Sequence, residues 1–143
     1  MASADTIIQK ALSYEGEGGT RFRNAYGLGS RDAWCVAFVW YVFQQAGASN
    51  LFYGGNKTAY VGDLKEYYSS VGKFGSTPKK GALVPYNWSY TPNEPYDHVG
   101  IVMSYTGSTI HTIEGNTNNS VVGGCKKFCV YGKYIFLIRI RYV

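Results

Sequence analysis

Residues 34–43 read WCVAFVWYVF, an apolar stretch that ends at the polar pair Gln44-Gln45 and at Gly47. The run is longer than most strands, Asp32 offers an N-cap, and Gly47 suits the position after a helix. A continuous buried strand is the alternative for so apolar a run, but its length and its ending favour a helix. We therefore expect a buried central helix over residues 34–43, capped by Asp32.

The segments on either side of this helix divide the chain into a helical half and a strand half. Before it, residues 5–15 have helical apolar spacing, with Asp5 as a cap and Gly16 as the end, and the glycine-rich residues 16–30 read as a loop. After it, residues 58–71 repeat apolar side chains every three or four positions, which predicts a third helix. Beyond Gly72 the pattern becomes β-rich, with strands expected at residues 82–86, 98–104, 108–114 and 134–142. Helices followed by an antiparallel sheet define an α+β fold with the helices packed on one face.

Length and composition limit the class of protein. A chain of 143 residues fits one domain, residues 1–143, and we expect a monomer. No apolar segment is long enough to span a membrane, and no secretory signal is visible at the N-terminus. The net charge of +5 favours an anionic partner, but the basic residues are scattered and no nucleic-acid-binding motif is present. We expect neither a membrane nor a nucleic acid as partner.

Cys35 is the first candidate for chemistry. If Asp32 caps the helix, Cys35 occupies the third helical position, where the helix dipole and unpaired backbone N–H groups stabilise a thiolate. The alternative is that Cys35 is one more small apolar core residue. A nucleophilic cysteine needs a base, and the chain offers only His98 and His111.

The expected hairpin between residues 98 and 114 separates the two histidines. A three-residue turn at residues 105–107 would place His98 directly opposite Glu114, whose carboxylate could orient the imidazole. His111 would then lie on the opposite face, beside Ile101. The inference depends on the turn, because a one-residue slip would move Glu114 to the other face. Asn116 could follow Glu114 on the same face and place its amide near the reacting centre.

Other residues are weaker candidates for metal binding or substrate binding. Cys125 and Cys129 have poor zinc spacing and read as two strand thiols or a reversible redox pair, so we predict no metal site. Aromatic residues next to the expected site could stack on sugars or line a peptide groove. The candidate substrate-binding residues are Trp34, Trp88 and Tyr96.

Three motifs in order make the chain similar to the CHAP domain family of cysteine, histidine-dependent amidohydrolases and peptidases. They are Ala33-Trp-Cys-Val-Ala-Phe-Val39, Asp97-His-Val-Gly-Ile-Val102 and Thr112-Ile-Glu-Gly-Asn116. The resemblance implies a papain-like fold related to NlpC/P60, with Cys35 as nucleophile, His98 as base, Glu114 as orienting group and Asn116 as a further polar residue of the site.

The resemblance also implies a substrate, peptidoglycan, cleaved at the N-acetylmuramoyl-L-alanine amide or within the stem peptide and cross-bridge. Residues 14–29 resemble the lead-in of phage members, which implies an endolysin made in the cytoplasm of an infected bacterium and released to the wall. A secreted effector amidase or NlpC/P60 peptidase, and a non-catalytic wall-binding module, are the alternatives. Some members bind calcium ahead of the cysteine, but this loop offers only Glu15, Glu17 and Asp32. We expect no cofactor, with calcium as the alternative.

Overall fold

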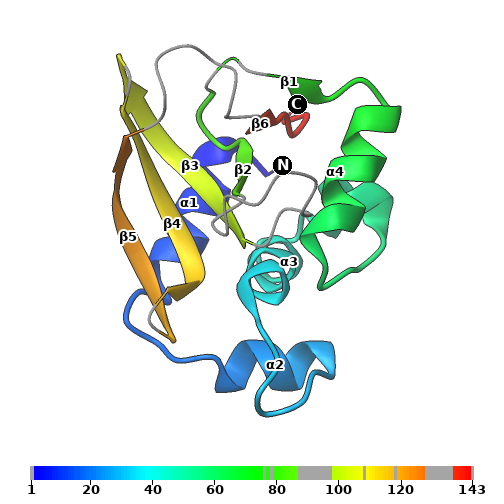
Figure 1. Cartoon of the computed structure of the whole chain (residues 1–143), viewed down its shortest axis with the longest axis vertical. Helices are drawn as coiled ribbons and strands as arrows, with labels where there is room; N and C mark the ends of the chain where they lie inside the picture. Colours follow the sequence, from blue (N-terminus) through cyan, green and yellow to red (C-terminus); the bar gives the residue numbers. More distant parts are fainter. Residues whose placement is uncertain are drawn as a thin grey trace.

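The structure of the protein is a computed structural model that describes residues 2–75, 77, 79–86, 98–107, 109–117, 119–127 and 137–142. Within these ranges the helical elements all precede the strands (Figure 1). The helices are α1 (Ala4–Leu12), α2 (Thr20–Tyr26), α3 (Cys35–Gln45) and α4 (Val61–Ser70), with the short 3₁₀ turns η1 (Ser49–Leu51) and η2 (Tyr53–Gly55). The strands are β1 (Phe74–Gly75), β2 (Leu83–Tyr86), β3 (His98–Thr106), β4 (Thr109–Thr117), β5 (Ser120–Lys127) and β6 (Leu137–Ile138).

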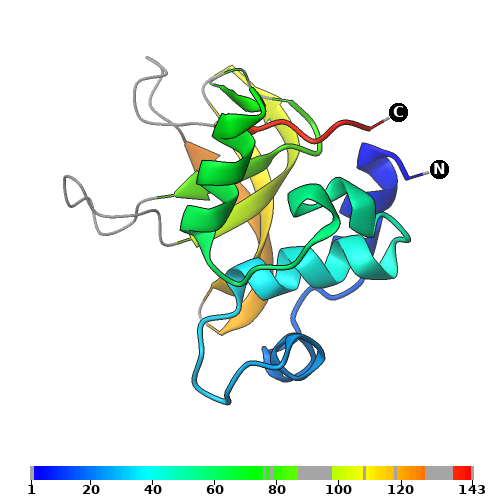
Figure 2. The same cartoon turned by 90° about the vertical axis from the view of Figure 1, so that its right-hand side faces the viewer.

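The described strands form one antiparallel sheet in the order β1-β6-β2-β3-β4-β5. Helix α3 packs on β3 and β4, α1 packs on α3 and β4, and α4 lies beside β1 at the other end of the sheet (Figures 1 and 2). The expected α+β class is therefore confirmed. None of the helices formed by the described residues is long and apolar enough to cross a membrane.

The expected central helix is present as α3, and its apolar residues form the middle of the core. Val36, Phe38, Val39, Val42 and Phe43 are each fully buried, which explains why the stretch is apolar on every side. Its hydrophobic cluster includes Val99, Ile101 and Ile113 from the sheet face that α3 covers. The alternating residues of the same strands, among them Val84, Val102 and Ile110, form a second cluster. Alternate residues of the strands therefore belong to clusters on opposite faces of the sheet.

Three predictions about the N-terminal half are wrong in detail. The cap of α1 is Ser3, whose hydroxyl accepts from the Thr6 backbone N–H, and the helix ends at Leu12 rather than at Gly16. Residues 16–30 are not a loop throughout, because they contain α2. Phe22 explains this helix: its ring is fully buried and stacks on Trp34 with ring centroids 5.3 Å apart.

The strand half also departs from expectation at its edges. Strand β5 was not among the expected strands, although Cys125 was read as a strand thiol. Its sequence, which includes Gly123 and Gly124, has little strand propensity of its own. The strand expected at residues 134–142 is described only from residue 137 on, as the two-residue β6. Beyond β6 the predicted alternation holds, with Ile138 and Ile140 buried and Arg139 and Arg141 exposed.

Candidate active site

A buried histidine–carboxylate pair lies at one end of the sheet. His98 Nε2 is 3.0 Å from Glu114 Oε1, and both side chains are almost completely buried. A buried carboxylate is stable only when donors surround it. Here Thr112 Oγ1 donates to Glu114 Oε2 at 2.7 Å and Thr117 Oγ1 donates to Oε1 at 3.2 Å. With Nε2 bound to the carboxylate, the ring of His98 is held in one orientation and Nδ1 is the nitrogen that can exchange a proton with another group.

The register that joins this pair differs from the predicted one. Thr106 pairs with Thr109 and Ser104 with His111, so the turn is one residue shorter than expected, which by itself would put His98 and Glu114 on opposite faces. A β-bulge between Val102 and Ser104 then adds Met103 to β3, so that Ile101 pairs with Ile113. This extra residue returns the side chains of His98 and Glu114 to the same face of the sheet. Glu114 is therefore opposite Gly100 rather than His98, and it reaches His98 diagonally on the same face.

Two glycines make room for this arrangement. A Cβ atom on Gly100 would lie 2.7 Å from Glu114 Cγ and 2.9 Å from Oε2, so the carboxylate lies directly over the Gly100 backbone. A Cβ atom on Gly115 would lie 2.5 Å from Phe38 Cβ, so β4 touches the first turns of α3 at this point. Larger residues at either position would separate the elements that the site joins.

Tyr86 covers the imidazole ring of His98. The two residues are directly paired on β2 and β3, and their ring centroids are 6.0 Å apart with the planes inclined by 25°. Burial raises the pKa of Tyr86, and the negative charge of nearby Glu114 raises it further. The phenol therefore stays neutral beside the pair. Sequence reasoning missed the parts played by Tyr86 and Thr112, although both alternate onto the face of Glu114 along their strands.

Cys35 is the first residue of α3, and its side chain is 5% exposed. It is a thiol rather than half of a disulfide. The predicted cap is wrong, because the Asp32 carboxylate accepts from the Gly29 backbone N–H at 2.7 Å and Trp34 occupies the N-cap position. Cys35 is therefore at the first helical position, where backbone N–H groups point outward without an intrahelical acceptor. In both views the start of β3, which carries His98, lies beside this end of α3 (Figures 1 and 2).

The remaining candidates divide into three groups. Asn116 follows Gly115 in β4 with φ of +63°, a left-handed conformation that Asn tolerates better than most residues, at a bulge between Glu114 and Thr117. His111 pairs with Ser104, not with Ile101 as expected. It lies three positions before Glu114 along the strand, so the two side chains are on opposite faces. The third group is the aromatic and thiol candidates.

Trp34 is not a surface residue for substrate. Its side chain is fully buried, it stacks on Phe22, and its indole packs against Gly19, so it belongs to the core. Trp88, Tyr96 and Cys129 lie outside the described residues. Cys125 lies in β5 opposite His111, and only its backbone is described.

The carboxylates ahead of α3 are all engaged with the protein. Glu15 accepts from the Gly123 backbone N–H at 3.0 Å, Glu17 pairs with Arg21 at 2.9 Å, and Asp32 is bound to Gly29. Among the described residues no group of three or more His, Cys, Asp or Glu side chains is arranged to hold a metal ion. The three loop carboxylates would have to leave these partners to form a calcium site.

The fold and the site together define an α+β protein with a cysteine at a helix N-terminus and a buried histidine–glutamate pair on the adjoining sheet. The CHAP domain family model matches residues 25–116, a range that contains Cys35, His98, Glu114 and Asn116. The chain therefore belongs to the CHAP domain family. A search of curated proteins gave no match.

A solved structure supports the fold. The chain is similar to the crystal structure of Ly7917, with a TM-score of 0.59 and 14% sequence identity. The similarity covers 97% of this chain and 63% of the other, so this chain spans less than two thirds of the length of that protein. At this level of identity the comparison concerns the fold alone.

Proposed function

We propose that this protein is a peptidoglycan hydrolase in which Cys35 is the nucleophile and His98 the base. The observation that carries the proposal is the buried His98–Glu114 pair, fixed by two threonine hydroxyls, on the strand end beside the helix that begins at Cys35. A cysteine at a helix N-terminus and an oriented imidazole are the two groups that thiol acyl transfer needs. Membership of the CHAP family supports the substrate class.

The proposed reaction has two steps. The thiolate of Cys35 attacks the amide carbonyl carbon, and the oxyanion accepts a hydrogen bond from the Cys35 backbone N–H at the start of α3. Protonated His98 gives its proton to the leaving nitrogen, the C–N bond breaks, and a thioester remains. His98 then takes a proton from water, which attacks the thioester and expels the thiolate. Glu114 keeps the imidazole oriented and stabilises its charged form in both steps.

The finer proposal is an N-acetylmuramoyl-L-alanine amidase or a stem-peptide or cross-bridge endopeptidase that acts as a phage endolysin. It rests on the sequence similarity of residues 14–29 to phage members. We propose that the enzyme is made in the infected cell, needs no cofactor, and acts on the wall as a monomer. Asn116 is proposed to complete the polar surroundings of the reacting carbonyl.

The test is the release of new amino groups from purified Gram-positive peptidoglycan, with the fragments identified by mass spectrometry. The wild type should release amines, and Cys35→Ala should lower the rate by about 10⁴-fold or more because the nucleophile is lost. Cys125→Ala is the matched control, since it removes a thiol from β5 and should leave the rate unchanged. A new N-terminal L-alanine identifies the amidase, whereas other new termini identify an endopeptidase.

Two outcomes would replace this proposal. Retained wall binding without amine release in the wild type would favour the non-catalytic wall-binding module. Cleavage of wall fragments without lysis of intact bacteria to which the protein is added from outside would favour an effector amidase over an endolysin.

A further inference from the structure

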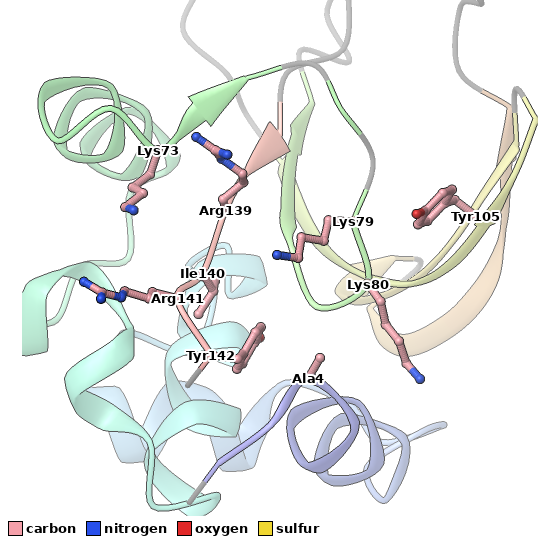
Figure 3. A pocket seen from close by; sticks show the side chains of 9 residues that line it. All are labelled: Ala4, Lys73, Lys79, Lys80, Tyr105, Arg139, Ile140, Arg141 and Tyr142. Carbon is pink, nitrogen blue, oxygen red and sulfur yellow. The ribbon is translucent and has the colours of Figure 1, made fainter.

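A second candidate site lies at the opposite end of β2 from His98. It is a cavity of about 500 Å³ between the C-terminal segment, the start of α1 and the residues that precede β2 (Figure 3). Among the described residues that line it, none is acidic and five are cationic: Lys73, Lys79, Lys80, Arg139 and Arg141. We call this cavity the basic pocket. So many cations around one concave surface attract a polyanion.

The backbone that carries these cations is fixed. The Arg139 N–H donates to the Lys73 carbonyl at 2.8 Å, and the Tyr142 hydroxyl donates to the Gly81 carbonyl at 2.8 Å. Between the two arginines, Ile140 is buried in the main core. The C-terminal residues 139–142 are thereby tied to the chain at Lys73 and at Gly81. The backbone around the basic pocket is therefore already in place before a ligand binds.

Within the described part of the chain, Lys80 is the one cation of the basic pocket that forms an ion pair. Lys80 pairs with Asp5, and in Figure 3 its side chain points away from the C-terminal segment, whereas Lys79 points toward that segment. Arg139 donates to the Gly72 carbonyl at 3.3 Å, an uncharged acceptor. Arg139 and Arg141 follow each other on the exposed side of an extended segment, and guanidinium groups bind phosphate oxygens in pairs.

We infer that the basic pocket binds a phosphodiester-linked polyol polymer of the bacterial wall, at a site separate from the candidate active site. The inference rests on the proposed function, because a wall hydrolase meets this polymer next to its substrate. The pocket is concave, and four cations other than Lys80 lie around it, which suits single phosphates of a flexible chain. A DNA duplex instead needs an extended basic stripe that follows its backbone.

The position of the basic pocket leaves the hydrolytic site open. Gly81 borders the pocket at one end of β2 and Tyr86 stacks on His98 at the other, a span of roughly 16 Å at the rise of a strand. A polymer held at one end would keep the enzyme on the wall and raise the local concentration of peptidoglycan at the other. Such tethering is electrostatic and weakens with salt.

The test compares Lys79→Gln/Arg141→Gln with a control of equal net charge, Lys10→Gln/Arg23→Gln, whose side chains do not line the basic pocket. The probe is synthetic poly(glycerol phosphate), and binding is measured by calorimetry from low salt to about 0.15 M. At that salt the pocket variant should bind about tenfold more weakly than the control, with a smaller salt slope, because two phosphate contacts are lost. Unchanged melting temperatures show that both variants are folded.

Turnover separates this inference from the proposed function. On native wall the pocket variant should be slower than the control, and on wall stripped of its phosphate polymers the two should be equal. Equal polymer binding by the two variants, or tighter binding of duplex DNA than of the polymer at equal phosphate concentration, overturns the inference. Polymer binding that depends on the basic pocket in a protein that releases no amines supports the inference and refutes the proposed hydrolase.

Discussion

The substitution Gly100→Ala tests how the His98–Glu114 pair is held. The added Cβ atom would lie 2.7 Å from Glu114 Cγ, 2.9 Å from Oε2 and 3.2 Å from Cδ. Carbon atoms in contact prefer about 3.5–4.0 Å, so the Glu114 side chain has to move by roughly 1 Å. Glu114 is 1% exposed, so its carboxylate is packed among protein atoms. The movement therefore breaks its hydrogen bonds to Thr112 and His98.

The expected cost combines two effects. Overpacking a filled site costs about 1–3 kcal/mol, and weakening a hydrogen bond to a charged group costs about 1.5–3 kcal/mol. The two effects share the same movement and do not add fully, so we expect a loss of about 2–4 kcal/mol in the free energy of unfolding, measured by urea denaturation. A displaced imidazole should lower the rate of amine release by about a hundredfold in urea-free buffer well below the melting temperature.

Gly124→Ala is the matched control for this substitution. Gly124 is also in an antiparallel strand, and a Cβ atom there would lie more than 4 Å from the described atoms outside its chain neighbours. We expect its stability to stay within about 0.5 kcal/mol of the wild type. If Gly100→Ala behaves like Gly124→Ala in both stability and rate, the carboxylate is not confined by the Gly100 backbone and the reasoning fails.

Four further predictions follow from the contacts of single residues and from the site chemistry. Thr112→Val keeps the shape of the side chain but removes the 2.7 Å hydrogen bond to Glu114, and should cost about 1–3 kcal/mol in urea denaturation; an unchanged midpoint would contradict it. Phe22→Ala removes a fully buried ring stacked on Trp34 and should cost about 3–5 kcal/mol by calorimetry, well above any exposed control. Burial raises the pKa of Tyr68 to about 12, so its contribution to stability is complete below pH 10 and is lost as pH rises toward 12. Between those values the wild type should lose stability faster than Tyr68→Phe, by up to about 1.4 kcal/mol per pH unit, and parallel curves would refute this. Finally, EDTA should leave amine release unchanged, and loss of activity that calcium restores would show that the metal is required.

The sequence predicted the central helix and the shared face of His98 and Glu114, but it reached the second result through a wrong register. The predicted turn and the observed turn differ by one residue, and Met103 adds one more residue to β3. The predicted and the observed pairing both place His98 and Glu114 on the same face. The change in the turn and the bulge together move the pairing of His98 by an even number of residues, which leaves the face unchanged. No local pattern marks Met103 as a bulge, since an apolar residue suits a regular strand equally well.

Other features depend on tertiary contacts that a linear pattern does not contain. Helix α2 has only Phe22 and Tyr26 on an apolar face, and it is stable because Phe22 stacks on Trp34. Strand β5 owes its position to its pairing with β4 rather than to its own composition. A tryptophan such as Trp34 can stack on a sugar or fill the core, and its burial in the structure identifies it as a core residue. The basic pocket assembles lysines and arginines that are scattered in the sequence.

The bulge at Met103 divides the β3–β4 hairpin into two halves that differ in the insertions and deletions they tolerate. At the base, between His98 and Val102, an insertion or deletion preserves the site only if it has an even number of residues. A change of one residue would move His98 to the opposite face of the sheet. At the tip, beyond Ser104, a single added residue can be absorbed in the turn. Relatives that diversify this hairpin should therefore differ freely in tip length and hardly at all in base length. A library of loops grafted at the tip could alter which surfaces the protein recognises, while His98 and Glu114 stay on the same face of the sheet.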